Sequence, residues 1–81
     1  MNWSVYIIEA NDNSYYTGIA TDVERRFEEH TSGLRGAKYF NGRKPLKIAY
    51  QEHGHTRSSA SKREAEIKKL SRQEKQILIG I

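Results

Sequence analysis

With 81 residues and no cysteine, the chain must stabilise one small core by the packing of apolar side chains alone. Five Tyr, two Phe and one Trp supply bulk for such a core, and 36% of the residues are hydrophobic against 30% that are charged. The absence of cysteine also excludes disulfide bridges, thiolate metal sites and cysteine nucleophiles. We expect a single domain over residues 1–81, and a reducing, cytoplasmic location fits this composition.

The chain carries no pattern for membrane insertion or export. No apolar run approaches the roughly 20 residues that a membrane helix requires. The first ten residues lack a basic stretch, and Glu9 ends their apolar run too early for a signal peptide. We therefore expect no association with a membrane.

The first twenty residues predict a β-hairpin. Trp3–Glu9 is short and rich in β-branched and aromatic residues, which favours a strand. Asn11–Ser14 is a dense turn signal, after which Tyr15–Thr17 resumes the strand pattern and Gly18 ends it.

A helix should follow the hairpin. Thr21 and Glu24 have the form of a capping box, with Thr21 as the N-cap, and the helix should run to about Thr31. At about 100° per residue, Arg26 lies beside the apolar stripe of this helix and Arg25 lies on the opposite side. The stripe consists of Val23, Phe27, His30 and Leu34.

The second half predicts a strand and two more helices. A long loop over 32–45 precedes a strand at Leu46–Gln51, and a second loop covers 52–56. Two helices follow. The first is capped by Ser58 or Ser59 and runs to about Leu70, and the second is capped by Ser71 and carries Ile77, Leu78 and Ile81. The order β-β-α-β-α-α predicts an α+β fold with a small three-stranded sheet flanked by helices.

Charge is divided unevenly along the chain. Residues 1–40 hold four basic and six acidic side chains, whereas residues 41–81 hold ten basic and four acidic ones. The net charge is therefore −2 in the first half and +6 in the second. A basic half indicates phosphate or nucleic-acid binding, although many small soluble proteins are basic without it.

Polar residues on faces that should be apolar indicate a site. Glu64 falls on the inward face of its helix, and Arg26 flanks the inward stripe of the first helix. Tyr6 and Tyr16 come from paired strands, so the four side chains could converge. Each also has a structural interpretation, because strand tyrosines pack in cores, an arginine stem covers apolar surface, and Glu64 could pair with Arg63 or Lys68.

The histidines carry a weaker signal. His30, His53 and His55 are expected on the surface, and His53 and His55 could together chelate a metal if their loop held both.

Taken together, Ser4-Val5-Tyr6, Tyr16-Thr17-Gly18, Arg26 and Arg63-Glu64 resemble the motifs of the GIY-YIG nuclease family. The resemblance covers nearly the whole chain. With Gly36-Ala37-Lys38-Tyr39 it is similar to the short, stand-alone UPF0213 branch, which in turn resembles the nuclease domain of structure-selective endonucleases. The first triplet departs from the family pattern, since it lacks the glycine and has valine in place of isoleucine.

The resemblance implies a role for each matching residue. Tyr6 or Tyr16 would orient or deprotonate the attacking water, and Arg26 would brace the phosphoryl transition state. Glu64 would bind a single Mg²⁺ or Mn²⁺ ion, with water and substrate supplying the other ligands.

Further residues are assigned supporting roles by the same resemblance. Gly18 would let the backbone approach the phosphate or the neighbouring strand, and His30 occupies the position of a supporting polar residue. Basic side chains on the long loop and the last two helices would contact phosphates without reading bases. These are Lys38, Arg43, Lys44, Lys62, Lys68, Lys69, Arg72 and Lys75.

Three functions follow as hypotheses. The first is a metal-dependent endonuclease acting on DNA rather than RNA, including branched or damaged DNA, in repair or maintenance. The second is a nucleic-acid-binding module on the same fold with little or no catalysis. The third is a nuclease subunit that a protein partner directs, with Ile77, Leu78, Ile79 and Ile81 either forming a docking surface or packing back on the core.

Overall fold

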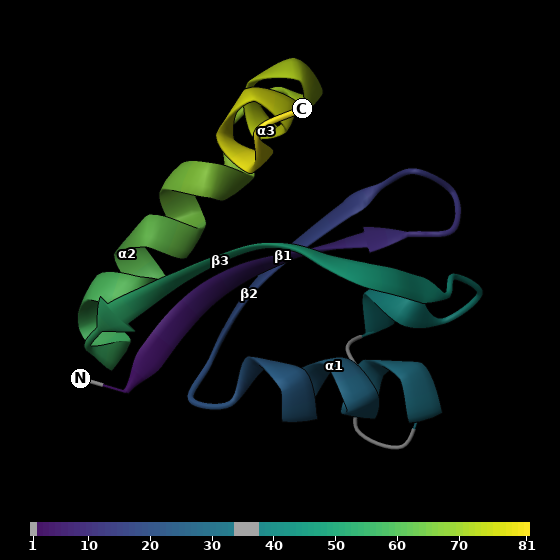
Figure 1. Ribbon diagram of the computed structural model, residues 1–81, viewed down its shortest axis with the longest axis horizontal. Coiled ribbons are helices and arrows are strands. Elements are labelled where there is room, and N and C mark those ends of the chain that lie inside the picture. The colour runs from purple at the N-terminus through teal and green to yellow at the C-terminus, as the bar shows by residue number, and fades with distance from the viewer. Residues whose placement is uncertain (1, 34–37) are drawn as a thin grey trace.

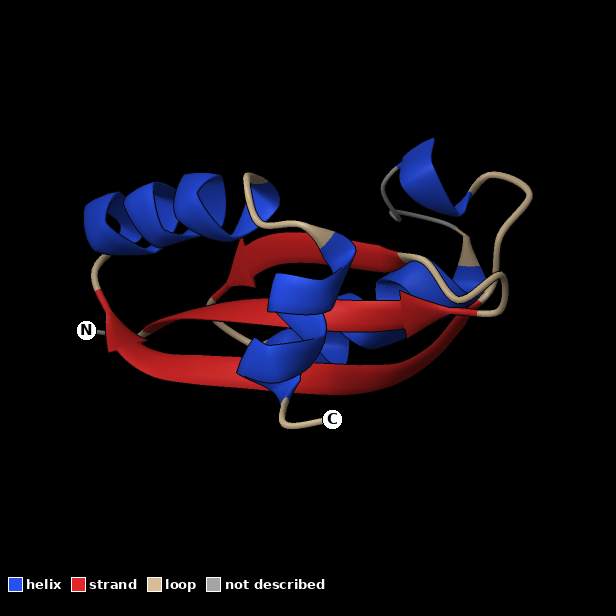
Figure 2. Ribbon diagram, turned by 90° about the horizontal axis from the view of Figure 1, so that it is seen from above, coloured by secondary structure: helices blue, strands red, loops and turns tan. Residues whose placement is uncertain are grey.

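The computed structural model describes residues 2–33 and 38–81, and it contains one antiparallel sheet with the strand order β2-β1-β3. The element order confirms the predicted β-β-α-β-α-α fold (Figure 1). The strands are β1 (Trp3–Ala10), β2 (Tyr15–Ala20) and β3 (Pro45–His55). The helices are α1 (Val23–Ser32), α2 (Arg57–Lys68), α3 (Arg72–Ile79) and a short 3-10 helix, η1 (Lys38–Phe40). The strands lie side by side with helices around them (Figure 2).

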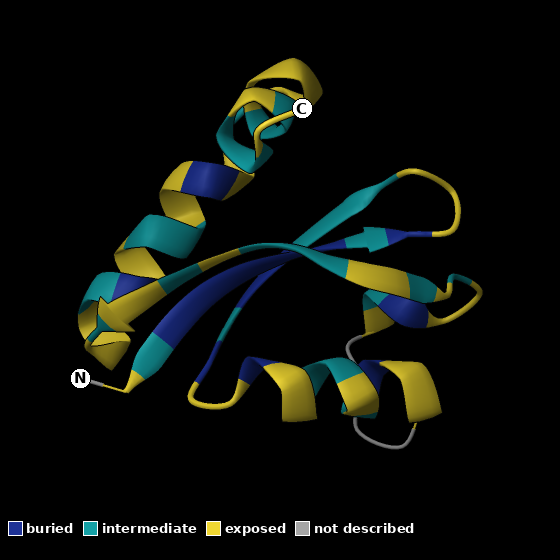
Figure 3. Cartoon of the chain, viewed as in Figure 1, coloured by how far each residue is buried: buried dark blue, intermediate teal, exposed yellow. Residues whose placement is uncertain are grey.

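The central strand β1 is buried on both faces, because helices cover the sheet from both sides (Figure 3). Successive side chains of a strand point to opposite faces. Tyr6 and Ile8 pack in the cluster on the α1 side, whereas Val5 and Ile7 pack against α2. A short continuous apolar run is typical of such a doubly covered strand. The core is therefore two thin clusters that share β1.

Two strands are longer than the sequence predicted. β2 continues through Gly18 to Ala20, because Gly18 pairs with Tyr6 in the register of the hairpin. β3 includes most of the predicted loop 52–56, because it keeps pairing with β1 as far as the Trp3–His55 pair. Hydrogen bonds to a partner strand therefore extend both elements beyond their local patterns.

Two predicted helix caps were wrong by one to three residues. Asp22, not Thr21, caps α1, because its backbone is extended and its carboxylate accepts the Arg25 N–H at 3.1 Å. Thr56 caps α2, and Ser59 instead occupies the third helical position, where it completes a capping box with Thr56.

The helix ends depart less from prediction. Helix α2 ends at Lys68, two residues before Leu70. The predicted capping box of α3 is confirmed, since Ser71 and Glu74 exchange hydrogen bonds. Leu34 of the predicted apolar stripe, and Gly36 and Ala37 of the UPF0213-like stretch, lie outside the described residues.

The apolar residues in α3 and just after it are divided between the core and the surface. Leu78 and Ile79 pack against the cluster of Val5 and Ile7, whereas Ile77 and Ile81 are 69% and 75% exposed. Within residues 2–33 and 38–81, no helix is both long enough and apolar enough to span a membrane.

Candidate active site

Tyr6 and Gly18 form the structural centre of the site. They lie opposite each other in the β1–β2 pair, and the tyrosine ring crosses over the glycine. A Cβ atom on Gly18 would lie 2.6 Å from the Tyr6 Oη and 2.8 Å from its Cζ. The close approach expected at Gly18 is therefore made by the Tyr6 ring. Because β2 is an edge strand, the phenol is directed towards the edge of the sheet.

An aromatic cluster surrounds the Tyr6 ring. The centroid of the Tyr16 ring lies 6.3 Å from that of Tyr6 and 5.3 Å from that of His30, so the two predicted tyrosines are neighbours. Tyr39 and Phe40, from η1, pack on Tyr16 with centroid distances of 5.3 Å each. This packing leaves the two phenols little rotational freedom.

His30 is buried, with an exposed fraction of 2%, so its predicted surface location was wrong. The reason is its place on the inward stripe of α1, where the imidazole contacts Tyr6 through Nε2 and the Tyr6 Oη at 3.1 Å. Burial, with a further contribution from the charge of Arg26, lowers the pKa of His30 to about 4. The ring is therefore neutral at pH 7.

Arg26 binds the same phenol from α1. It hydrogen-bonds the Tyr6 side chain and also pairs with Glu29 at 3.2 Å. Since a guanidinium can only donate, the phenolic oxygen accepts from Arg26, and its own hydrogen can be donated to the neutral Nε2 of His30. The Tyr6 hydroxyl is thus held by two side chains.

The pKa of Tyr6 reports which charges surround it. Burial raises this pKa strongly and the neighbouring Tyr16 raises it further, whereas the charge and hydrogen bond of Arg26 oppose the rise. Glu64 also raises it, although this carboxylate comes from α2 on the other side of the sheet. Arg26 and Glu64 therefore both act on Tyr6, from helices on opposite sides of the sheet.

Glu64 is partly buried and forms an ion pair with Lys68, whose Nζ lies 3.1 Å from Oε2. This bears out one of the two structural interpretations of Glu64. Arg63, the other predicted partner, instead binds Glu52 and Glu66 at 3.2 Å each. An exposed i,i+4 pair of this kind is weak, so Glu64 can exchange Lys68 for another cation at little cost.

A metal ion at this site would depend on Glu64. Residues 2–33 and 38–81 contain no group of three or more His, Asp or Glu side chains placed to hold a metal. One carboxylate suits Mg²⁺ or Mn²⁺, which retain several waters and take other ligands from substrate phosphates. In the alternative pair, His53 hydrogen-bonds Ser4, and His55 contacts Glu52 and Ser59.

Two of the predicted phosphate contacts, Arg43 and Arg72, lie at the β1–β2 turn. Arg43 pairs with Asp12 at 2.7 Å, and its guanidinium lies over the Tyr39 ring, 4.4 Å from the centroid. The guanidinium of Arg72 lies 4.9 Å from the ring centroid of Tyr15 and donates a hydrogen bond to the carbonyl oxygen of Asn13. These two arginines thus brace the β1–β2 hairpin. Among the predicted phosphate-binding lysines, Lys75 is partly buried. The exposed ones are Lys38, Lys44, Lys62, Lys68 and Lys69.

A polar network at the end of β3 was not predicted from the sequence. Glu52 accepts hydrogen bonds from Tyr50 and Arg63 and contacts His55 at 2.7 Å. This network ties β3 to α2, and so helps to fix the helix that carries Glu64.

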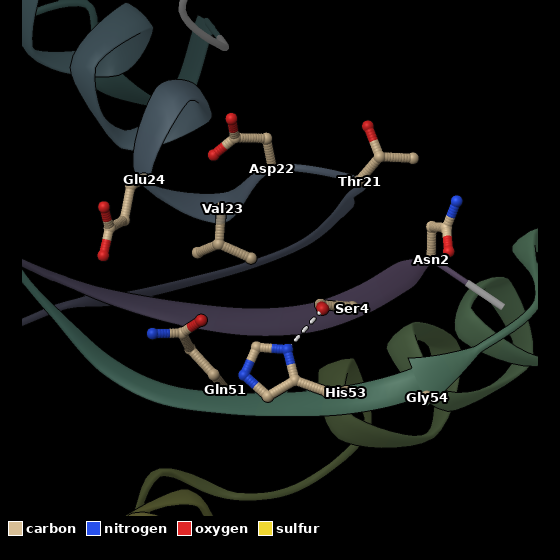
Figure 4. Close-up of a pocket in the computed structure, with 9 residues that line it drawn as sticks. All are labelled: Asn2, Ser4, Thr21, Asp22, Val23, Glu24, Gln51, His53 and Gly54. Carbon is tan, nitrogen blue, oxygen red and sulfur yellow. Dashed lines mark hydrogen bonds between the residues drawn. The ribbon is translucent and has the colours of Figure 1, made fainter.

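Two hollows flank the Thr21–Asp22 connection between β2 and α1. The larger, about 380 Å³, contains a Ser4 Oγ to His53 Nδ1 hydrogen bond of 2.7 Å and the carboxylates of Asp22 and Glu24 (Figure 4). None of the described residues that line it is Lys or Arg, so this lining is unsuited to phosphate. The smaller hollow, about 280 Å³, is bounded by Arg26 itself.

This fold and these residues define a nuclease-type domain. Residues 2–77 match the family model described as the GIY-YIG catalytic domain, and the chain belongs to the GIY-YIG family.

Within that family the chain is similar to UPF0213 proteins. It is 53% identical over 74 residues to one from Haloquadratum walsbyi, and the alignment covers 91% of this chain and 82% of the relative. It is 46% identical over 77 residues to one from Desulfotalea psychrophila, covering 95% and 70%. The solution NMR structure of a UPF0213 protein from Bacillus halodurans matches with a TM-score of 0.60 and 44% identity, covering 98% of this chain and 83% of the other.

Proposed function

We propose that this protein is a metal-dependent endonuclease that hydrolyses phosphodiester bonds in DNA, including branched or damaged DNA. The observation that carries the proposal is the electrostatic coupling of Tyr6 to both Arg26 and Glu64, which come from helices on opposite sides of the sheet. A nuclease domain requires a water-orienting group, a cation for the phosphoryl oxygens and a metal-binding carboxylate in one place.

Tyr6 supplies the water-orienting group. Because its pKa is raised, the phenol remains protonated near neutral pH and positions water through its oxygen. Its proton has an acceptor in the neutral Nε2 of His30, 3.1 Å away. When a cation compensates the charge of Glu64, Tyr6 loses one of the contributions that raise its pKa, so the phenol passes its own hydrogen to His30 more readily while its oxygen takes the proton of the water.

Arg26 and Glu64 stabilise the charge that develops on the phosphate. Arg26 offers a fixed fork of donors to the phosphoryl oxygens while it keeps the phenol oriented. Glu64 would hold Mg²⁺ or Mn²⁺, which polarises the phosphate and assists the departing 3′ oxygen.

The test compares labelled flap, fork and plain duplex DNA with Mg²⁺, Mn²⁺ or EDTA. Glu64→Ala and Arg26→Ala should each lose about 10²–10³ in cleavage rate, the usual cost of one such electrostatic group. Glu66→Ala is the matched control, because Glu66 lies on the same helix and also forms an ion pair, but with Arg63. Wild-type cleavage by either site variant would contradict the assignment.

The existing Lys68–Glu64 pair favours a second candidate, a nucleic-acid-binding module without catalysis. In that case both the wild type and Glu64→Ala would bind DNA in a salt-sensitive manner, and neither would cleave it. A nuclease that needs a protein partner would gain metal-dependent cleavage when that partner is added.

A further inference from the structure

The smaller hollow lies beside Arg26 and has no part in the chemistry proposed above. Three elements form it: β1 contributes Trp3, the end of β2 contributes apolar residues, and α1 contributes charged ones. The lining includes Trp3, Ile19, Ala20, Arg25, Arg26 and Glu29. An aromatic ring, an apolar base and two guanidinium groups therefore border one space next to the candidate site.

Trp3 is the only tryptophan of the chain and is partly buried. Its inner side packs against the cluster of Val5 and Ile7, which fixes the indole in place. The guanidinium of Arg57 lies 5.6 Å from its ring centroid. A fixed indole beside basic groups is the combination that proteins use to stack bases of single strands while holding the backbone.

The charges of this hollow suit a nucleotide better than those of its larger neighbour. Two guanidinium groups and two carboxylates line this hollow, and Glu29 is shared by Arg26 at 3.2 Å and Arg25 at 4.0 Å. Asp22, which borders both hollows, is occupied in capping α1. The larger hollow instead combines Asp22 and Glu24, and no arginine of residues 2–33 and 38–81 lines it, so it is less suited to phosphate.

Size decides what part of a nucleic acid can enter. The hollow of about 280 Å³ falls slightly below the range of about 300–1,000 Å³ that drug-sized ligands occupy. It therefore accommodates a group as small as one base and excludes a duplex. A base can enter only after it has left its pair and its stack, which costs least where the strand is already open.

We propose that this hollow receives one unpaired base of the substrate strand, stacked on Trp3, while Arg26 holds the adjacent phosphate. The inference rests on the proposed nuclease function and names its substrate class: DNA that is single-stranded or open next to the cut. The stack would select for strand opening and not for a particular base, because every base offers a flat aromatic face.

The single tryptophan makes the experiment specific, because all indole fluorescence comes from Trp3. The protein is titrated in EDTA and low salt with a mixed-sequence single-stranded oligodeoxynucleotide, and separately with the same sequence as a blunt duplex. Quenching by the single strand, at concentrations where the duplex causes little, is the expected result.

Two variants separate stacking from packing. Trp3→Phe keeps an aromatic face, and Trp3→Leu keeps an apolar side chain against the Val5 and Ile7 cluster without one. Binding is followed by the anisotropy of a labelled strand, and circular dichroism confirms that both variants fold. Trp3→Leu should bind the single strand about 5- to 150-fold more weakly, whereas Trp3→Phe should stay close to wild type.

Equal quenching by both DNA forms, or wild-type affinity in Trp3→Leu, would overturn this proposal. The nuclease assignment would still stand if the wild type cleaves DNA and Glu64→Ala does not. If neither DNA form binds even at low salt, both the stacking proposal and the nuclease assignment fail.

Discussion

Replacing Gly18 with alanine tests whether the Tyr6 ring needs the space above the glycine. The added Cβ would lie 2.6 Å from Oη of Tyr6 and 2.8 Å from Cζ of the same ring. It would also lie 3.1 Å from Cε2 of Tyr16. Tyr6 is only 1% exposed and its hydroxyl contacts His30, so the ring cannot swing away freely. Overpacking of this kind costs about 1–3 kcal/mol.

For a domain of this size, that cost corresponds to a fall of roughly 5–20 °C in Tm. Circular dichroism measures the melting temperature, and proton NMR titration follows the pKa of His30 as a reporter of the Tyr6 position. Cleavage should fall along with stability, since the displaced phenol no longer meets Arg26. A variant with wild-type Tm and an unchanged His30 titration would refute the packing argument.

A double-mutant cycle with Tyr6→Phe makes the test sharper. Phenylalanine removes the atom nearest to the new Cβ and leaves the ring carbon at 2.8 Å. Gly18→Ala should therefore cost less in the Tyr6→Phe background than in the wild type, by about 0.5 kcal/mol or more. Equal costs in both backgrounds would show that the Tyr6 hydroxyl is not the obstacle.

Three further predictions concern stability. Thr17 Oγ1 is buried and has no hydrogen-bond partner in the part of the chain that the structure describes, so Thr17→Val should raise the free energy of unfolding in urea by about 1 kcal/mol. A loss of stability would reveal an unrecognised partner. Because the pKa of His30 is about 4 in the folded state against 6.5 as its ordinary value, the unfolded state binds more protons between these values. The free energy of unfolding should fall by about 3 kcal/mol as pH drops from 6.5 towards 4. His30→Phe should flatten this fall, which urea titrations at successive pH values would measure. An unchanged slope in the variant would assign the pH dependence to other groups. Thr56→Ala should lower the free energy of unfolding by about 1 kcal/mol, because it removes the hydroxyl that accepts the Ser59 N–H. Thr56→Ser should stay close to wild type in thermal melts. Equal losses in both variants would contradict the capping role.

Much of the fold could be predicted because its signals are local. The hairpin turn at Asn11–Ser14, the apolar run of β1 and the capping box at Ser71 depend on side chains a few residues apart. The neighbourhood of Tyr6 and Tyr16 also followed, since consecutive strands joined by a short turn pair with each other.

The site could be predicted only in its residue types. The helical stripe of Val23, Phe27 and His30 indicates that the imidazole faces inward, but no local pattern shows that it contacts Tyr6, because that contact spans 24 positions. Trp3 and Arg25 were missed as possible ligand contacts for the same reason. Their shared hollow exists only when the start of β1, the end of β2 and α1 are assembled.

The difference between these two groups of features is one of range. Turns and the Ser71 cap are stabilised by hydrogen bonds within a few residues, so their side-chain chemistry is sufficient to place them. The length of β3 and the coupling of Glu64 to Tyr6 depend on the sheet and on helices packed from both sides. These features arise because groups far apart in the sequence are desolvated and brought into contact, which happens only in the folded chain.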